Sequence, residues 1–147
     1  MPGVASTIYD ALALRMVQLG FEESNAAFDP ERIGQTVRDR SFMISFDNAV
    51  PDFDRGSFCK KFSVERLAKV TVFYRMNPGH SGEGIKEVLR DAYDKEEEII
   101  SSILAVRVDS LVDFETVDSI ETKPENNDSG EWLVTTVNFR MKYRITL

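Results

Sequence analysis

The residue types that most often carry out chemistry are scarce in this chain. Its 147 residues include one histidine, His80, and one cysteine, Cys59. A single cysteine allows neither an intramolecular disulfide nor a thiolate metal cluster, and the same scarcity disfavours most Cys/His catalytic schemes and zinc sites. We therefore expect neither a metal nor a cofactor.

The surroundings of these two residues do not suggest catalysis. His80 lies in "NPGHSGEG", and a catalytic histidine needs a nucleophile and a third group that orients it. A glycine-rich turn instead predicts a solvated loop histidine. Its glycines open a helix as phosphate-binding loops do, but they match neither the dinucleotide nor the Walker pattern. Cys59 stands beside Lys60 and Lys61, which would favour its thiolate, yet a lone loop cysteine is more often incidental.

Carboxylates are the remaining chemical candidates. The segment "DKEEE" contributes Asp94, Glu96, Glu97 and Glu98. Such oxygens suit a hard cation, but helical spacing spreads them around the helix, which favours a solvated surface. The sequence does not exclude a carboxylate pair of the glycosidase kind, although nothing singles one out. We assign no catalytic residue and expect that the chain is not an enzyme; a small carboxylate enzyme stays as an alternative.

The length and composition of the chain predict one soluble globular domain over residues 1–147. Hydrophobic residues at 42% and charged residues at 29% are ordinary for such a domain. No stretch approaches the ~18 apolar residues of a membrane span, and the N-terminus lacks the pattern of a signal peptide, so we expect a cytosol-like compartment. The net charge of −7 argues against a nucleic-acid binder.

The charges are unevenly distributed along the chain. The two basic intervals are Arg55, Lys60, Lys61, Arg66 and Lys69, and then Arg140, Lys142 and Arg144. The segment around "DKEEEII" holds a cluster of acidic residues. A split of this kind is typical of two complementary surfaces rather than of one ligand site.

Hydrophobic periodicity predicts an α+β fold with the element order α-β-β-α-β-β. A first helix presents one apolar stripe, and Gly20 ends it. Strands follow at 40–46 and 64–76, then a helix from about Glu83 to Leu104, then strands at 106–121 and 132–147. We expect the helices to pack on a mostly antiparallel four-stranded sheet. Residues 47–63 would form a seventeen-residue loop between the first two strands.

That loop is too long for a hairpin connection and is rich in aromatic and charged residues. Two interpretations remain open. It is either an Ω-like loop that folds on its own aromatic side chains, or an arm that docks on a neighbouring subunit. The residues of such an arm would be Phe53, Arg55, Phe58, Lys60, Lys61 and Phe62.

In the last sixteen residues, "WLVTTVNFRMKYRITL", every second residue from Leu133 to Leu147 is apolar, with only Thr135 interrupting. Sixteen residues of strand span roughly 50 Å, whereas a compact chain of this size has a diameter of roughly 38 Å. We therefore expect either a bent strand or neighbouring subunits that cover part of it.

The predicted closing hairpin suggests a register. With Phe114 opposite Phe139, the apolar faces coincide, and each opposite-charge pair on the other face contributes about 0.2–1 kcal/mol. Those pairs would be Arg140–Asp113 and Arg144–Asp109. The basic face formed by Arg140, Lys142 and Arg144 would then be largely neutralised, which favours a cross-strand ladder over nucleic-acid binding.

The order of these elements resembles that of the tail terminator proteins of long-tailed bacteriophages, also described as tail completion or head–tail joining proteins. The similarity covers an N-terminal helix, the irregular "FDPERIGQTVRDRSFMISF" that leads into a strand, the long acidic helix and a closing hairpin that reaches the C-terminus. Its most specific part is "DRSFMISF", Asp39 to Phe46.

The resemblance implies a hexameric ring in the virion, at the head-proximal end of the tail tube. Such a ring stops tube polymerisation and docks the head-completion protein, or stopper, after assembly in the bacterial host cytoplasm. The tail tube protein and the stopper would be the partners, and DNA would pass through the lumen without specific binding. An acidic lumen repels phosphate, and the candidate lumen acids are Asp94, Glu97 and Glu98. The subunit or partner interface would use the arm residues above together with Arg140, Lys142 and Arg144.

Other functions remain open beside this one. The chain could be a monomeric or dimeric α+β binding module that uses the 47–63 loop. It could also be another ring component of the neck or tail, such as the stopper or the tube subunit.

Overall fold

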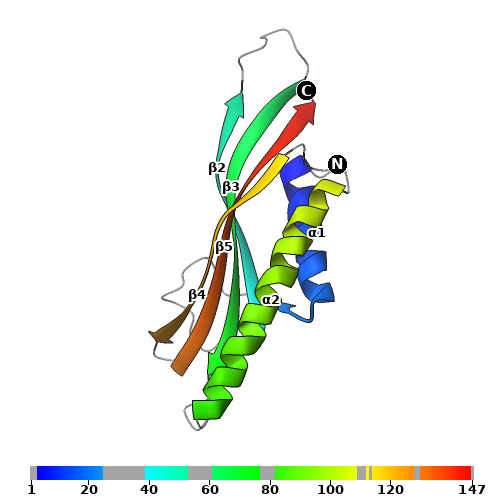
Figure 1. The fold of residues 1–147 in the computed structure, drawn as a ribbon. Helices are drawn as coiled ribbons and strands as arrows, with labels where there is room; N and C mark the ends of the chain where they lie inside the picture. The colour runs from blue at the N-terminus through cyan, green and yellow to red at the C-terminus, as the bar shows by residue number, and fades with distance from the viewer. Residues whose placement is uncertain are drawn as a thin grey trace.

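The computed structural model is α+β, with two helices on a five-stranded mixed sheet (Figure 1). It describes residues 3–24, 39–52, 61–76, 82–108, 112, 114–127 and 130–146. The helices are α1 (Val4–Gln18) and α2 (Gly82–Val108). The strands are β1 (Glu22–Glu23), β2 (Ser41–Asp52), β3 (Lys61–Met76), β4 (Phe114–Asn127) and β5 (Gly130–Thr146).

The sheet order is β1-β2-β3-β5-β4, so β3 and β5 are its central long strands. β1 runs parallel to β2, and all other neighbours are antiparallel. α1 and α2 lie side by side on one face of the twisted sheet (Figure 1). Of the helices in the described ranges, none is long and apolar enough to cross a membrane.

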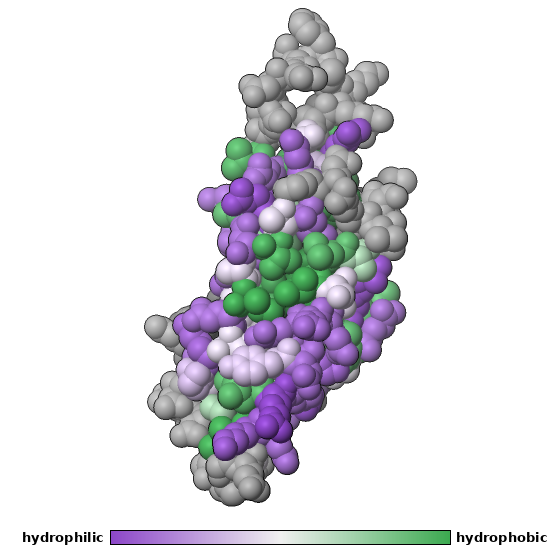
Figure 2. All heavy atoms as spheres, viewed as in Figure 1, coloured by the Kyte–Doolittle hydropathy of each residue, from purple (hydrophilic) through white to green (hydrophobic). Residues whose placement is uncertain are grey.

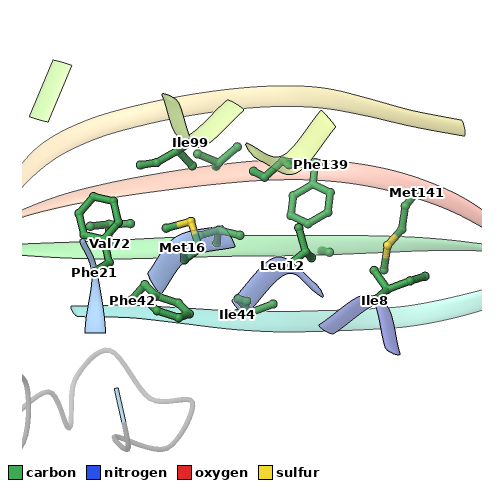
Figure 3. Close-up of a cluster of buried hydrophobic side chains, with 14 of the residues drawn as sticks. Ile8, Leu12, Met16, Phe21, Phe42, Ile44, Val72, Ile99, Phe139 and Met141 are labelled. Atoms are coloured by element: carbon green, nitrogen blue, oxygen red, sulfur yellow. The ribbon is translucent and has the colours of Figure 1, made fainter. Parts of the chain in front are cut away.

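The main core lies between the helix layer and the sheet, and a smaller buried cluster of Phe73, Trp132 and Val134 lies on the other face. From α1, the predicted stripe buries Ile8, Leu12 and Met16, each at most 2% exposed. Figure 3 shows these side chains directed at the strands, where they meet residues of β2, β3 and β5. Ile99 approaches the same cluster from α2. The apolar stripe of each helix thus covers the apolar face of the strands, as helical and strand periodicity require.

The predicted four-stranded, mostly antiparallel sheet is wrong, because β1 adds a parallel strand at one edge. α1 ends in a Schellman motif: Gly20, at a φ of 95°, donates to Val17 O, and Phe21 donates to Met16 O. This reversal carries the chain back along the sheet, where Glu22 pairs with Ser41. A two-residue strand is too short to show any periodicity, so the sequence pattern missed it.

The predicted loop over 47–63 is also wrong in extent. β2 continues to Asp52 and β3 already begins at Lys61. The register shifts between Phe46 and Ala49, where β2 carries one extra residue. Such a bulge breaks the alternation of side chains, and for that reason the pattern appeared to end at Phe46.

The predicted boundaries and register of the closing hairpin are wrong. Val106 and Val108 were assigned to a strand, but both belong to α2. β4 instead includes Pro124, which the sequence placed in a turn. Phe114 pairs with Lys142, and Val117 rather than Phe114 lies opposite Phe139.

Position explains why β4 was hard to predict. β4 is an edge strand, so it tolerates a proline and polar side chains that would break a central strand. Its polar segment therefore resembles a turn.

The length of β5 is matched within the chain itself. β3 and β5 pair without interruption from Lys61↔Thr146 to Met76↔Glu131, a ladder of roughly 50 Å at 3.3 Å per residue. Figure 1 shows the ends of β2, β3 and β5 projecting past the helix layer. The part of the last strand that exceeds the expected diameter is therefore paired, along one edge, with β3 of the same chain.

Candidate subunit interface

The sheet face opposite the helices carries exposed apolar and basic side chains near its projecting end. Alternation places Leu67 on this face, directly across from Arg140. Leu67 is 46% exposed and Val50, on the neighbouring strand, is 64% exposed. We call Val50, Leu67, Lys69, Arg140 and Arg144 the sheet patch. The patch combines apolar contact area with positive charge.

Three predicted interface residues share this face. Lys142 and Arg144 alternate with buried residues along β5, as Arg140 does, so all three bases point away from the helices. Lys61 and Phe62 lie in β3, where their backbones pair with β5. The remaining predicted interface residues, Phe53, Arg55, Phe58 and Lys60, lie outside the described ranges.

Arg140 has different partners from those predicted. Its guanidinium lies 3.6 Å from Glu65 Oε1 on β3 and 3.5 Å from Asp118 Oδ2 on β4. Thr116, not Asp113, is opposite it on β4. Asp109 and Asp113 themselves lie outside the described ranges. Arg140 thus bridges the two strands that flank β5.

The bridges of Arg140 are expected to contribute little to stability. Arg140→Ala should lower the free energy of unfolding by about 0.2–1 kcal/mol, because exposed ion pairs are weak. Urea unfolding measures this value, and Lys123→Ala, which removes another exposed pair, is the matched control. A loss above about 2 kcal/mol would mean that Arg140 has a structural role beyond a surface ion pair.

The outer surface of α2 carries charges of both signs among apolar side chains, since exposed Lys86 and Arg90 lie on the same line of the helix as Tyr93 and Glu97. Tyr93, Glu97, Ile100 and Leu104 follow one another at helical spacing on this surface, and Asp94 flanks them. Tyr93 is 49% exposed and Leu104 is 40% exposed. We call these five residues the α2 stripe. The predicted lumen acids Asp94, Glu97 and Glu98 are all exposed, and Glu98 pairs with Lys95 at 2.9 Å.

α1 also exposes apolar side chains. Leu14 and Val17 of α1 are 60% and 52% exposed, and the two helices are neighbours. Figure 2 shows apolar side chains gathered across the middle of this face of the molecule. The helix layer therefore presents exposed apolar side chains among charges of both signs, and the opposite face of the sheet presents exposed apolar side chains among bases and acids.

A partly buried chain of polar side chains connects α2 to the sheet. The Thr122 hydroxyl of β4 donates to Glu96 Oε1 of α2 and lies 2.8 Å from the hydroxyl of Thr135 on β5. Since a threonine hydroxyl carries one hydrogen, Thr135 must be the donor in the second bond. Glu96 and Thr135 each interrupt an apolar pattern in the sequence. The structure brings them together through Thr122, which sequence reasoning did not single out.

A second polar contact anchors the beginning of β2 to α2. Arg40, at a φ of 59°, pairs with Asp91 of α2 at 2.5 Å. Its guanidinium lies 6.0 Å from the centre of the Tyr74 ring. Burial raises the pKa of the Tyr74 hydroxyl well above its usual range, and Asp91 adds to the shift. These contacts hold the helix on the sheet, and they gather no set of groups suited to catalysis.

Tyr9 connects α1 to the edge strand β1. Its hydroxyl donates to Glu23 Oε1 at 2.6 Å. Burial, together with the Glu23 carboxylate, raises the pKa of Tyr9 from 10.0 to about 12. The fold therefore favours the neutral phenol.

The raised pKa of Tyr9 predicts a loss of stability in alkaline solution. The contribution of the neutral phenol is complete below pH 10 and is lost as the pH rises toward 12. Tyr9→Phe should therefore show a smaller decline in unfolding free energy over this window, with an offset of about 0.5–1.5 kcal/mol at neutral pH from the lost hydrogen bond. Urea unfolding at several pH values measures both. An equally steep decline in the variant would contradict the assignment.

Over the described part of the chain, no group of three or more His, Cys, Asp or Glu residues is arranged to hold a metal ion. Comparison with protein-family models and with curated proteins gives no match for this chain.

Proposed function

We propose that this chain is a structural virion protein that forms a ring at the head-proximal end of a bacteriophage tail tube. The ring ends tube polymerisation and docks the head-completion protein. One observation carries the proposal: the domain exposes large apolar side chains on two different sides, Tyr93 and Leu104 on α2 and Val50 and Leu67 on the opposite face of the sheet. A closed ring requires two different contact surfaces on each subunit.

The resemblance of the sequence to tail terminator proteins supplies the place of the ring. In that family the ring has six members, the tail tube protein binds one side, and the stopper binds the other. The net charge of −7 suits a ring through which DNA passes, because carboxylates and phosphates repel each other. DNA then crosses the lumen without a specific binding site.

The test combines the full chain with tail tubes assembled from the tube protein of the same phage. We expect negative-stain images to show the chain at one end of each tube only, and growth of the tube from free subunits to stop when the chain is added. Incorporation along the whole tube would identify a tube subunit instead. No binding to tubes would contradict the proposal and favour a binding module.

A further inference from the structure

The five-stranded sheet has two edges along which another strand could be added. β4 forms one edge over its whole length, Phe114–Asn127. At the other edge β1 pairs only with Ser41 and Phe42, so the described residues place no strand beside the rest of β2. An edge strand presents unpaired backbone N–H and C=O groups, which are a template for a strand of another copy.

Each of these two edge strands contains a bulge. In β4 the register with β5 shifts at Asp118, and in β2 the register with β3 shifts at Asp47 and Asn48. All three residues are exposed. A bulge bends and twists the strand that carries it, so the backbone donors and acceptors along that edge lose their regular spacing. A straight strand from another copy could therefore not pair along the whole edge.

Each edge strand also contains a proline. Pro124 of β4 lies opposite Leu133, and Pro51 of β2 lies opposite Val64. Proline has no backbone N–H, and a sheet accommodates it where its nitrogen faces the open side of an edge strand. At that position an added strand would find the proline ring in place of a hydrogen-bond donor.

The central strands β3 and β5 contain neither feature. They pair without a register shift over sixteen residues each, from Lys61↔Thr146 to Met76↔Glu131, and no proline occurs in either strand. Exposed charges, Glu121 and Lys123, flank the open side of β4 as well. We infer that the bulges and prolines prevent the sheet edges of different copies from pairing, so that copies meet through the faces of the domain. This inference holds whether or not the copies form the proposed ring.

Removing these features from the full chain tests the inference. The β4 variants are Pro124→Val alone and Pro124→Val with deletion of Asp118, which leaves Val117 and Ser119 opposite adjacent residues of β5. Pro51→Val with deletion of Asn48 changes β2 in the same way. Thr116→Val is the matched control, because it also places valine at an exposed position of β4 but leaves every backbone donor unchanged.

Size-exclusion chromatography with light scattering over a concentration series measures association, thioflavin T fluorescence reports sheets that extend between copies, and circular dichroism shows whether each variant folds. Each double change should lower the concentration for half-association at least about tenfold, because every new backbone hydrogen bond between copies adds stability. Pro124→Val alone should lower it about threefold. Thioflavin T fluorescence should rise in the same variants, and Thr116→Val should behave like the unchanged chain.

Two results would overturn the inference. Folded variants that keep the size distribution of the unchanged chain would show that the edges merely tolerate the bulges and prolines. Equal association of Thr116→Val and Pro124→Val would assign the effect to added apolar area. If a deletion prevents folding, the comparison of Pro124→Val with Thr116→Val decides, because both positions are exposed. The absence of a ring from the unchanged chain would contradict only the proposed function.

Discussion

Replacing Ile99 by alanine should lower the free energy of unfolding by about 2–5 kcal/mol, the usual cost of truncating a fully buried aliphatic side chain. Ile99 is 0% exposed and reaches from α2 into the cluster between the helices and the sheet (Figure 3). Its removal leaves a cavity that close-packed neighbours fill only in part. Urea or thermal unfolding of the full chain measures the loss.

Ile85 offers a control of the same residue type on the same helix. Helical spacing places both isoleucines on the same side of α2, but Ile85 is 39% exposed. Ile85→Ala should therefore change the free energy of unfolding by no more than about 1 kcal/mol, because little area is lost and alanine favours helix. Equal losses for the two variants would show that α2 lies on the sheet in a different rotation.

Thr122→Val should lower the free energy of unfolding by about 1–3 kcal/mol, because it removes the middle member of a partly buried chain of polar side chains. The change preserves shape but leaves Glu96 without this donor and leaves the hydroxyl of Thr135, which is 0% exposed, without this acceptor. Chemical unfolding of the purified variant gives the value. A change below about 0.5 kcal/mol would contradict the proposed chain.

Thr135 donates to Thr122, and Thr122 donates to Glu96. The two threonine substitutions should therefore lower stability by unequal amounts. Thr135→Val removes only the terminal donor, and Thr122 still donates to Glu96, so the cost should stay within about 1 kcal/mol. Adding Thr135→Val to Thr122→Val removes the isolated hydroxyl and should recover part of the loss. This double-mutant cycle isolates the coupling between the two threonines. Additive losses would mean that the hydroxyls do not depend on each other.

Sequence periodicity identified the elements that are apolar on one side. The stripe of α1 and the alternation of β5 after Thr136 are strong signals because each buries one face against the core, as Ile8 and Phe139, both 0% exposed, illustrate. At the start of β5, Trp132 and Val134 are buried on the other face as well. Even the single irregularity in β5 has a structural meaning, since Thr135 is buried with a polar partner.

Elements without such a face were misplaced. β4 lies at the sheet edge, and exposed polar residues such as Glu121 and Lys123 give it no apolar period. The turn chemistry of Pro124 then favoured a loop. Just before β4 in the sequence, Val106 and Val108 stand two positions apart as in a strand, but both belong to the end of α2. A period-2 pattern of a few residues cannot distinguish a helix end from a strand.

The candidate interface could be predicted only in part. Alternation along β5 was sufficient to place Arg140, Lys142 and Arg144 on one face. Their neighbours were not predictable, because the partners Glu65 and Asp118 of Arg140 come from two other strands whose register the sequence did not determine. The exposed apolar residues of α2 were missed for a related reason: only packing against α1 and the sheet decides which side of a helix remains open.

Native mass spectrometry of the full chain, alone over a concentration series and bound to tail tubes, with negative-stain images of each large species, tests ring formation most directly. We expect a closed ring of six copies that becomes the dominant species as concentration rises or when tubes are present. Monomers or dimers under both conditions would contradict the proposed ring and would favour a binding module.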